Sequence, residues 1–143
     1  MINIYLIRHG KASAGWDTVD PNLGIKGKKQ SEKIAIKLSN LAKEPFDIFS
    51  SPLKRCIETA KPFSEITKKK IKIEDKVIEI PSPIKNLKQR VIWLKRVLPL
   101  TWEELIADKE TNVSKIDYFL WRENILKFFL SLNKDTFIFT HYL

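Results

Sequence analysis

The stretch that decides the fold is LIRHGKAS, residues 6–13. It overlaps an apolar N-terminal run, MINIYLI, which predicts a short buried strand over residues 2–7. Arg8, His9 and Gly10 then follow with no spacer. Ligands of parallel sheets bind beyond the carboxyl ends of the strands. A cation and an imidazole at the end of the first strand therefore predict a ligand site at that edge.

Strands and helices alternate along the rest of the chain. This pattern predicts an α/β fold, a three-layer sandwich with a mostly parallel sheet and helices on both faces. No repeat, low-complexity segment or linker divides the sequence, so residues 1–143 are expected to form a single domain. Further elements are expected as strands over 46–50, 71–80 (one strand or a strand pair) and 136–140, and as helices over 25–43, from Ser51 onwards, within 84–110 and over 114–132.

Two helix starts carry specific signals. Ser51 is expected to be an N-cap, with Pro52 at the first helical position. Thr101 with Glu104 three residues later is typical of a capping box. The helix over 114–132 is apolar around much of its circumference, which favours a helix buried between the sheet and a neighbour. A homodimer face is the alternative interpretation.

The charge balance narrows the class of partner. The chain has 26 Lys and Arg against 17 Asp and Glu, a net charge of +9. The excess is spread along the sequence, and its densest run is KKKIK at 68–72, so a lysine-rich solvated surface is favoured over a nucleic-acid interface. No nucleic-acid partner is expected, whereas a positive potential suits an anionic small molecule.

The sequence also indicates a compartment. No apolar run is long enough to span a bilayer, and the N-terminus lacks the features of a secretory signal, so no membrane partner is expected. The single cysteine, Cys56, cannot form an internal disulfide, and a cytoplasmic location is the default. Cys56 lies on a predicted helix, where a small packed residue is favoured over a nucleophile.

The two histidines of the chain share one structural position. His9 follows the first strand, and His141 follows the last. A histidine with one aimed nitrogen is a nucleophile at neutral pH, and its imidazole can accept a phosphoryl group and pass it to water. Attack on an anionic phosphoryl group needs cations around its oxygens, and the guanidinium groups of Arg8 and Arg55 match them. Gly10 would let the backbone approach the anion. Each feature alone is weak, but together they favour phosphoryl chemistry.

These motifs resemble those of the histidine phosphatase superfamily, whose fold is called phosphoglycerate mutase-like. In that family an Arg-His-Gly motif ends the first strand, and a second histidine ends a late strand, as FIFTH does here. Two further motifs match the family residue by residue. They are Leu23, Gly27, Gln30 and Ser31 before and within the first helix, and Ser51, Pro52, Arg55, Thr59 and Ala60 after the second strand.

The resemblance implies roles for particular residues. His9 would be the nucleophile that becomes phosphorylated, while Arg8, Arg55 and His141 would hold the phosphoryl oxygens. An acid that protonates the leaving oxygen is usually found after a third strand, where VIEI places Glu79; Glu74 and Asp75 are its rivals. These side chains can stabilise the negative charge of the phosphoryl group, so neither a metal nor a cofactor is expected.

Three departures from the family pattern bear on the substrate. Gly15 stands where mutases carry an asparagine, and PSPIKNLKQR replaces a loop with a Trp-Glu-Gly sequence. Members also continue past the second histidine, so the sequence is expected either to be truncated at its C-terminus or to omit a disordered tail. The short chain and the RHGKA sequence favour the small phosphatases.

The expected activity is that of a phosphoric monoester hydrolase of the histidine acid phosphatase type. Its substrate would be a phosphorylated small molecule, a phosphoprotein or a phosphohistidine, and the reaction would pass through a phosphohistidine on His9. A phosphoglycerate-mutase-type transfer and a non-catalytic phosphate-binding scaffold remain as alternatives.

Overall fold

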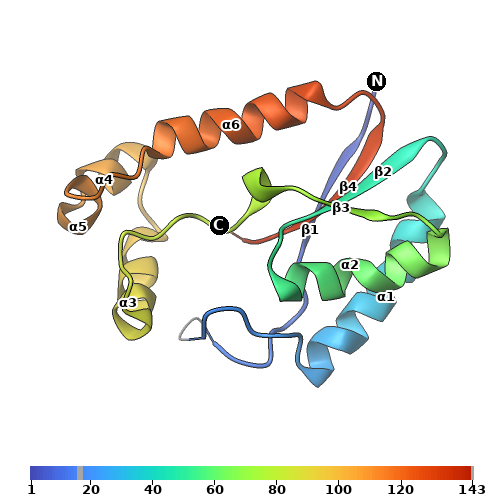
Figure 1. Ribbon diagram of the computed structural model, residues 1–143, viewed down its shortest axis with the longest axis horizontal. Coiled ribbons are helices and arrows are strands. Elements are labelled where there is room, and N and C mark those ends of the chain that lie inside the picture. The colour runs from blue at the N-terminus through green and yellow to red at the C-terminus, as the bar shows by residue number, and fades with distance from the viewer. Residues whose placement is uncertain (16–17, 143) are drawn as a thin grey trace.

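Four parallel strands form the central sheet of the computed structural model, which describes residues 1–15 and 18–142. The strands are β1 (Ile4–Arg8), β2 (Phe46–Ser50), β3 (Ile71–Ile73) and β4 (Asp135–Thr140). They lie in the order β1–β4–β2–β3 (Figure 1), and every pairing is parallel. The parallel sheet expected from the sequence is confirmed. Of the domain expected over 1–143, residues 16, 17 and 143 lie outside the described residues.

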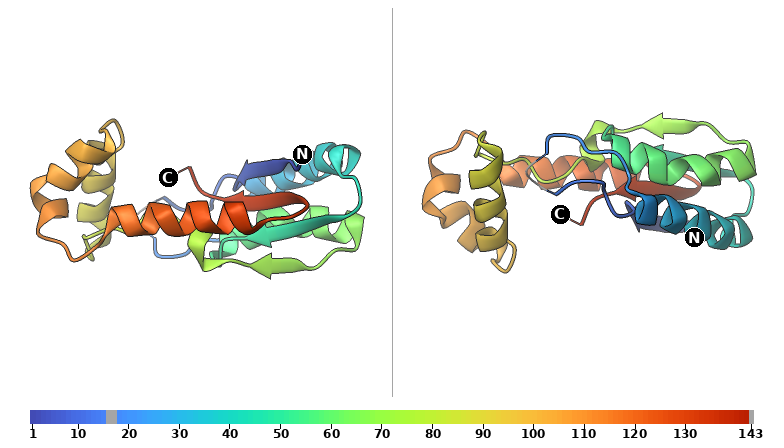
Figure 2. Two further views of the ribbon diagram at one scale, coloured as in Figure 1. Left: turned by 90° about the horizontal axis from the view of Figure 1, so that it is seen from above. Right: turned by 90° about the horizontal axis from the view of Figure 1, so that it is seen from below.

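Helices cover both faces of the sheet, as Figure 2 shows from opposite sides. Helices α1 (Ile25–Leu41) and α2 (Lys54–Thr67) pack on one face, and α6 (Tyr118–Ser131) packs on the other. The three-layer sandwich is therefore confirmed. The pleat of β4 explains the two cores, because Phe137 and Phe139 face α1 and α2 while Ile138 faces α6.

A second group of helices lies beyond the carboxyl ends of the strands, at one end of the molecule (Figure 1). It consists of α3 (Leu87–Val97), α4 (Trp102–Ala107) and α5 (Lys109–Asn112). These helices have their own apolar core around Trp93, whose indole N–H donates to Thr111 Oγ1 at 3.1 Å. The expected capping box of Thr101 and Glu104 is present at the start of α4.

The strand or strand pair expected over 71–80 is confirmed only for Ile71–Ile73 and was wrong for the rest of the range. Within 71–80 only the residues of β3 pair with β2, and this pairing ends where Ser50 lies opposite Ile73. Beyond that point the chain of β2 turns towards α2, so no neighbouring strand remains to pair with. The backbone instead forms a 3₁₀ turn, η1 (Asp75–Val77), capped by the side chain of Glu74. The following residues run on towards α3 without a strand partner.

The start of α2 also differs from the expectation. The helix begins at Lys54 and its N-cap is Leu53, so neither Ser51 nor Pro52 has its expected place. Ser51 still belongs to the sheet, because its N–H donates to Phe139 O at 2.9 Å. Its hydroxyl lies 2.8 Å from a nitrogen of His141, whereas its contact with the N–H of Leu53 is longer, at 3.4 Å. The side chain serves the site more than the helix.

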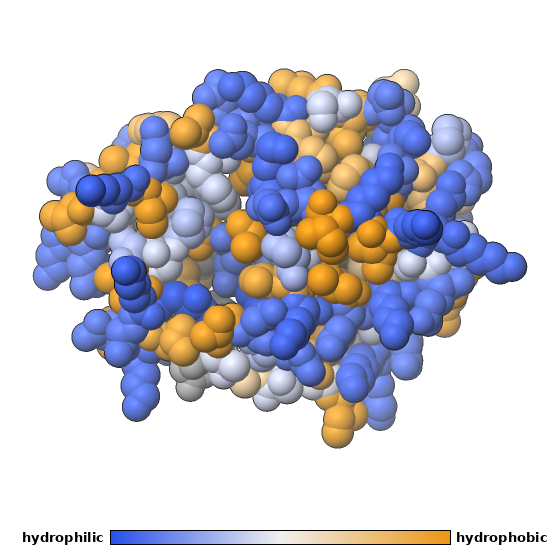
Figure 3. Space-filling model, viewed as in Figure 1, coloured by the Kyte–Doolittle hydropathy of each residue, from blue (hydrophilic) through white to orange (hydrophobic). Residues whose placement is uncertain are grey.

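Helix α6 is less buried than expected. It begins at Tyr118, capped by Asp117, and only Tyr118 and Phe128 are buried among its residues. Leu126 and Leu130 are exposed, as are Ile4 and Leu6 of the edge strand β1. On the face shown in Figure 3, such apolar side chains form small patches between hydrophilic ones. The homodimer interpretation stays a prediction. No helix within the described residues is long and apolar enough to cross a bilayer.

Candidate active site

The carboxyl ends of three strands bring the two histidines together. His9 follows β1 and donates its backbone N–H to Thr140 O at 3.0 Å, so the first histidine is fastened to the end of β4. His141 follows β4 directly. The two rings lie edge to face, with 5.3 Å between their centroids and an angle of 63° between their planes. The sequence separates them by most of the chain, and the parallel sheet places them side by side.

The ring of His9 has one nitrogen fixed and one free to react. Its Nδ1 lies 2.7 Å from Gly10 O, and a carbonyl oxygen only accepts, so Nδ1 carries the hydrogen. The lone pair is then on Nε2, which accepts from Arg55 Nε at 3.3 Å. Burial lowers the pKa of His9, and the charges of Arg55 and Arg8 lower it further, although the bond to Gly10 opposes them. His9 is therefore neutral at neutral pH, with Nε2 as a nucleophile.

Arg55 lies at the centre of the site and is only 5% exposed. Besides His9, its guanidinium contacts two carboxylates: Glu79 Oε2 lies 3.2 Å from Nη2, and Asp20 Oδ1 lies 3.7 Å from Nη1. A buried cation is tolerated when it is paired in this way. The second position of α2 and these two carboxylates fix the guanidinium against the nucleophile.

His141 is held by three neighbours. Ser51 Oγ lies 2.8 Å from its Nε2, Arg55 Nη2 lies 3.3 Å from its Nδ1, and Cys56 Sγ lies 3.3 Å from Nε2. A guanidinium only donates, so Nδ1 accepts here and Nε2–H donates to Ser51. Burial, Arg55 and His9 lower the pKa of His141 to about 3, so the ring is neutral. Burial also raises the pKa of Cys56 to about 12, which agrees with a packed residue and not with a nucleophile.

The structure separates Glu79 from its two rivals. Glu79 contacts Arg55, and its Oε1 lies 4.0 Å from His141 Nδ1, with the side chain 16% exposed. Glu74 instead caps η1 and pairs with Lys76 at 3.4 Å, and Asp75 is exposed on that turn. Of the three acids considered from the sequence, only Glu79 is brought to the two histidines.

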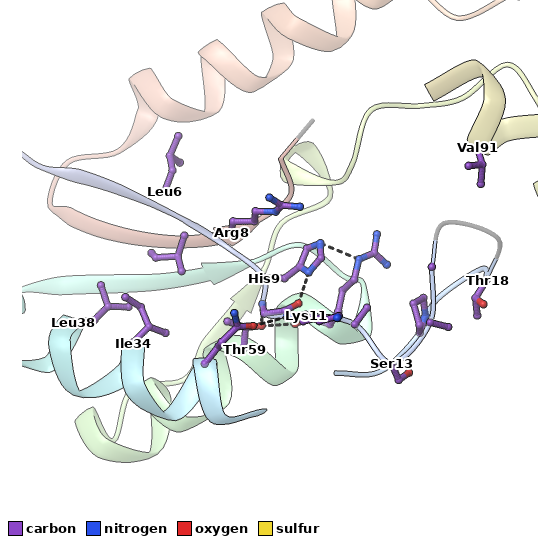
Figure 4. A pocket seen from close by; sticks show the side chains of 18 of the residues that line it. Leu6, Arg8, His9, Lys11, Ser13, Thr18, Ile34, Leu38, Thr59 and Val91 are labelled. Atoms are coloured by element: carbon purple, nitrogen blue, oxygen red, sulfur yellow. Dashed lines mark hydrogen bonds between the residues drawn. The ribbon is translucent and has the colours of Figure 1, made fainter. Parts of the chain in front are cut away.

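Arg8 stands at the mouth of the site. It is the last residue of β1 and is exposed, with its guanidinium carbon 5.1 Å from the centroid of the Tyr142 ring. Figure 4 shows its side chain beside the ring of His9. Arg8 can therefore meet an anion that approaches Nε2 of His9.

The site opens into a large cavity of about 1560 Å³ (Figure 4). Arg8, His9 and Arg55 line it, together with the loop that follows β1 and the start of α3. His141 and Glu79 are not among its described lining residues; both reach the site through Arg55, which they contact. A phosphoryl group entering the cavity would reach them by taking over the contacts of that guanidinium.

Residues shared with the family motifs fix the loop after His9. The N–H of Gly10 donates to Thr59 Oγ1 at 2.9 Å, and that hydroxyl donates to Arg55 O at 2.6 Å. The N–H of Lys11 donates to Gln30 Oε1 at 2.9 Å. A Cβ on Gly10 would lie only 2.7 Å from Gly27 O. Gly10 is thus needed for close packing against α1, and the expected approach of its backbone to the anion stays a prediction.

Asp20 is a site residue that sequence reasoning missed. Its Oδ1 accepts from the N–H of Lys54 at 3.0 Å, besides pairing with Arg55. The carboxylate therefore lies at the first turn of α2, where a negative charge is favourable. Asp20 lies in a polar loop with no periodicity and no matched motif, so the sequence carried no signal for it.

The fold and the site define the class of protein. A model of the histidine phosphatase superfamily (branch 1) matches residues 4–83, more than half of the chain, and the chain belongs to this superfamily. The curated phosphoserine phosphatase 1 of Hydrogenobacter thermophilus is 39% identical over 88 residues, which are 56% of this chain and 39% of that protein. The match thus spans well under half the length of the curated relative.

Solved structures agree on the fold. Phosphoserine phosphatase from Entamoeba histolytica, solved in complex with 3-phosphoglyceric acid, has a TM-score of 0.69 and 20% identity, over 99% of this chain and 74% of that one. A mycobacterial glucosyl-3-phosphoglycerate phosphatase has a TM-score of 0.60 and 17% identity, over 95% and 72% of the two chains. The phosphoglycerate mutase-like fold expected from the sequence is confirmed.

The lowered histidine pKa values predict how stability depends on pH. Both histidines have folded-state pKa values below 6.5, so the unfolded chain binds more protons as the pH falls below 6.5. Stability is therefore complete above pH 6.5 and declines towards the folded pKa of His141, about 3. For His141 this amounts to about 2 kcal/mol between pH 6.5 and 5, above the range where most carboxylates titrate. Urea unfolding at pH 7, 6 and 5 measures it.

The matched variant for this measurement is His141→Asn. Its stability should fall less steeply over the same range, by about 1.4 kcal/mol per pH unit, because the titrating ring is gone. A wild-type stability that is constant from pH 6.5 to 5 would contradict the neutral, buried state of His141.

Proposed function

We propose that this protein hydrolyses phosphate monoesters through a phosphohistidine on His9. The observation that carries the proposal is the fixed ring of His9, with Nδ1–H held by Gly10 O and the lone pair of Nε2 aimed at Arg55. A neutral imidazole beside a buried guanidinium suits attack on phosphorus. The relatives named as phosphatases support the same reaction class.

In the first step, Nε2 of His9 attacks phosphorus in line with the ester oxygen. The N–P bond forms as the P–O bond to the leaving group breaks. Arg8 and Arg55 take up the negative charge on the phosphoryl oxygens, and Arg55 exchanges its contact with Glu79 for the phosphoryl group. Once Arg55 has turned to the phosphoryl group, neutral His141 takes its other tautomer, in which the ring hydrogen has moved from Nε2 to Nδ1. Nδ1–H then donates to a phosphoryl oxygen, and the Ser51 hydroxyl, which serves as donor or acceptor, donates to Nε2.

Glu79 is the proposed proton carrier. Once the phosphoryl dianion has taken over Arg55, Glu79 acts in this step as a carboxylic acid. It then gives its proton to the leaving oxygen. In the second step the carboxylate takes a proton from water as the water oxygen attacks phosphorus, which breaks the N–P bond and releases orthophosphate.

The finer assignments belong to this proposal as well. We assign the enzyme to the histidine acid phosphatase type, acting on phosphorylated small molecules. The phosphoserine phosphatase names of two relatives support such substrates. A cytoplasmic location stays a prediction from the sequence.

The experiment that tests the proposal compares two leaving groups. Glu79→Gln should lower kcat/KM for an alkyl phosphate by about 10²- to 10⁴-fold, because an alkoxide leaves poorly without a proton. With p-nitrophenyl phosphate the loss should stay below about 10-fold, since that phenolate leaves unaided. Glu74→Gln, whose side chain caps η1, is the matched control and should change neither rate. Wild-type protein that releases phosphate from neither ester would overturn the proposed activity, and equal losses for both esters would remove Glu79 as the acid.

A further inference from the structure

We propose that Asp20 is a positioning residue, which keeps the guanidinium of Arg55 aimed at the transferring phosphoryl group while Glu79 gives up its own contact. This inference rests on the proposed phosphatase function and adds a residue to the machinery of the same site. In the proposed first step, Arg55 exchanges Glu79 for the phosphoryl group. A guanidinium held by that one carboxylate would then be free to turn with its new ligand, whereas a second carboxylate keeps it in place.

The first observation is how the three nitrogens of the Arg55 guanidinium are divided. Nε lies 3.3 Å from Nε2 of His9, and Nη2 lies 3.3 Å from Nδ1 of His141. These two nitrogens face the histidines, where they can donate side by side to two phosphoryl oxygens. Nη1 lies instead beside Oδ1 of Asp20, at an ion-pair distance of 3.7 Å. Binding of a phosphoryl group at Nε and Nη2 therefore leaves the contact with Asp20 intact.

The second observation is that Asp20 also fixes the backbone from which Arg55 projects. Its Oδ1 accepts from the N–H of Lys54 at 3.0 Å, and Lys54 is the first residue of α2, directly before Arg55. The N-cap of this helix is Leu53, whose apolar side chain cannot accept a hydrogen bond. One carboxylate oxygen therefore restrains the arginine at both ends, at the backbone and at the guanidinium.

The third observation is that the loop carrying Asp20 is fastened on two sides. The N–H of Leu23 donates to Oε2 of Glu58 on α2 at 2.6 Å. On the other side, the N–H of Ser13 donates to Asn22 O at 2.8 Å, which ties the loop to the segment that follows the nucleophile. Asp20 therefore has a fixed place beside the start of α2, and its carboxylate can restrain a neighbour without moving with it.

The role of Asp20 follows from the charges around Arg55. The guanidinium is almost fully buried, so it needs a negative partner at each stage of the reaction. Glu79 is such a partner in the free enzyme, the phosphoryl group replaces it in the complex, and Asp20 remains throughout. Because Asp20 acts on the orientation of the guanidinium and not on the substrate, its charge should stabilise the transition state more than the bound ester.

The test is Asp20→Asn, because asparagine keeps an oxygen that can accept from the N–H of Lys54 and loses the charge that faces Arg55. We expect kcat for p-nitrophenyl phosphate to fall about 10- to 100-fold, with KM changed by less than about 3-fold. Inhibition by vanadate, which adopts the trigonal-bipyramidal shape of the transferring group, should weaken by about 10-fold or more, and inhibition by orthophosphate by less than about 3-fold. A substitution that only loosened the helix would weaken both inhibitors alike.

Glu58→Gln is the matched control. It also removes one carboxylate charge that ties this loop to α2, and glutamine keeps an oxygen that can accept from the N–H of Leu23. This variant should leave kcat and both inhibition constants within about 3-fold of the wild type. Asp20→Ser, which also keeps a capping oxygen without the charge, should repeat the result of Asp20→Asn.

A further pair of variants shows whether Asp20 acts through Arg55. In the Arg55→Lys background, Asp20→Asn should lower kcat by less than about 3-fold more, since no Nη1 is left to hold. An active wild type with Asp20→Asn within about 3-fold of its kcat would overturn the inference and leave the phosphatase function standing. Equal losses for Asp20→Asn and Glu58→Gln, equal weakening of the two inhibitors, or an undiminished loss in the lysine background would also overturn it. A wild type that hydrolyses no ester would overturn the phosphatase function itself, and the inference with it.

Discussion

Replacing His9 by alanine is expected to lower kcat for any phosphate monoester by about 10⁴-fold or more. The substitution removes the ring whose Nε2 carries its lone pair beside Arg55, while Nδ1 of the same ring is bound to Gly10 O. Without this ring no covalent intermediate can form, so the loss should approach the full contribution of the covalent step. Release of p-nitrophenol measures it.

The control for this variant is its binding of orthophosphate, because the phosphate-binding residues remain. Arg8 and Arg55 are still present, and Arg55 keeps its contacts with Glu79 and Asp20. The alanine variant should therefore bind orthophosphate in isothermal titration within about 10-fold of the wild type. A variant that binds phosphate and hydrolyses esters at more than a tenth of the wild-type rate would contradict the role of His9.

The second large effect is expected for Arg55→Lys, which should lower kcat/KM by about 10²- to 10³-fold. One guanidinium contacts His9, His141, Glu79 and Asp20, and an ammonium point charge cannot reach these partners and a phosphoryl group together. Because lysine keeps the positive charge, the loss of kcat/KM measures what the geometry of the guanidinium contributes. Steady-state kinetics with an aryl phosphate measures it.

Arg96→Lys is the matched control for Arg55→Lys. Arg96 is partly exposed and pairs with Asp108 and Glu110, away from the cavity. It should leave kcat/KM within about 2-fold. If Arg55→Lys had a similarly small effect, the fixed guanidinium would not be what stabilises the transferring group.

Sequence reasoning found the edge of the sheet where the site lies. Short apolar runs that end in Arg8-His9 and Thr140-His141 predicted strands there, and parallel strands place their carboxyl ends together. That rule predicted the convergence of His9 and His141, which the structure shows. Glu79 was preferred over its rivals by motif alone, and the structure brings it to Arg55.

The errors concern features that depend on partners distant in sequence. Residues 71–80 alternate like a strand, but strand pairing ends with β2 at Ser50, which the local pattern cannot reveal. The hydroxyl of Ser51 could cap a helix or hold His141, and only the fold decides between them. Asp20 lies in a loop without periodicity, and its contact with Arg55 depends on how that loop folds back on α2.

Trapping the phosphorylated protein shows whether the reaction passes through a phosphohistidine on His9. The wild type is mixed with p-nitrophenyl phosphate, quenched in alkali after one turnover, and digested for mass spectrometry, because a phosphohistidine survives base and is lost in acid. We expect one phosphoryl group, on the peptide that contains His9. It should be labile to acid and absent from the His9→Ala variant. A stable phosphoryl group on another residue, or turnover with no phosphorylated peptide at any quench time, would contradict it.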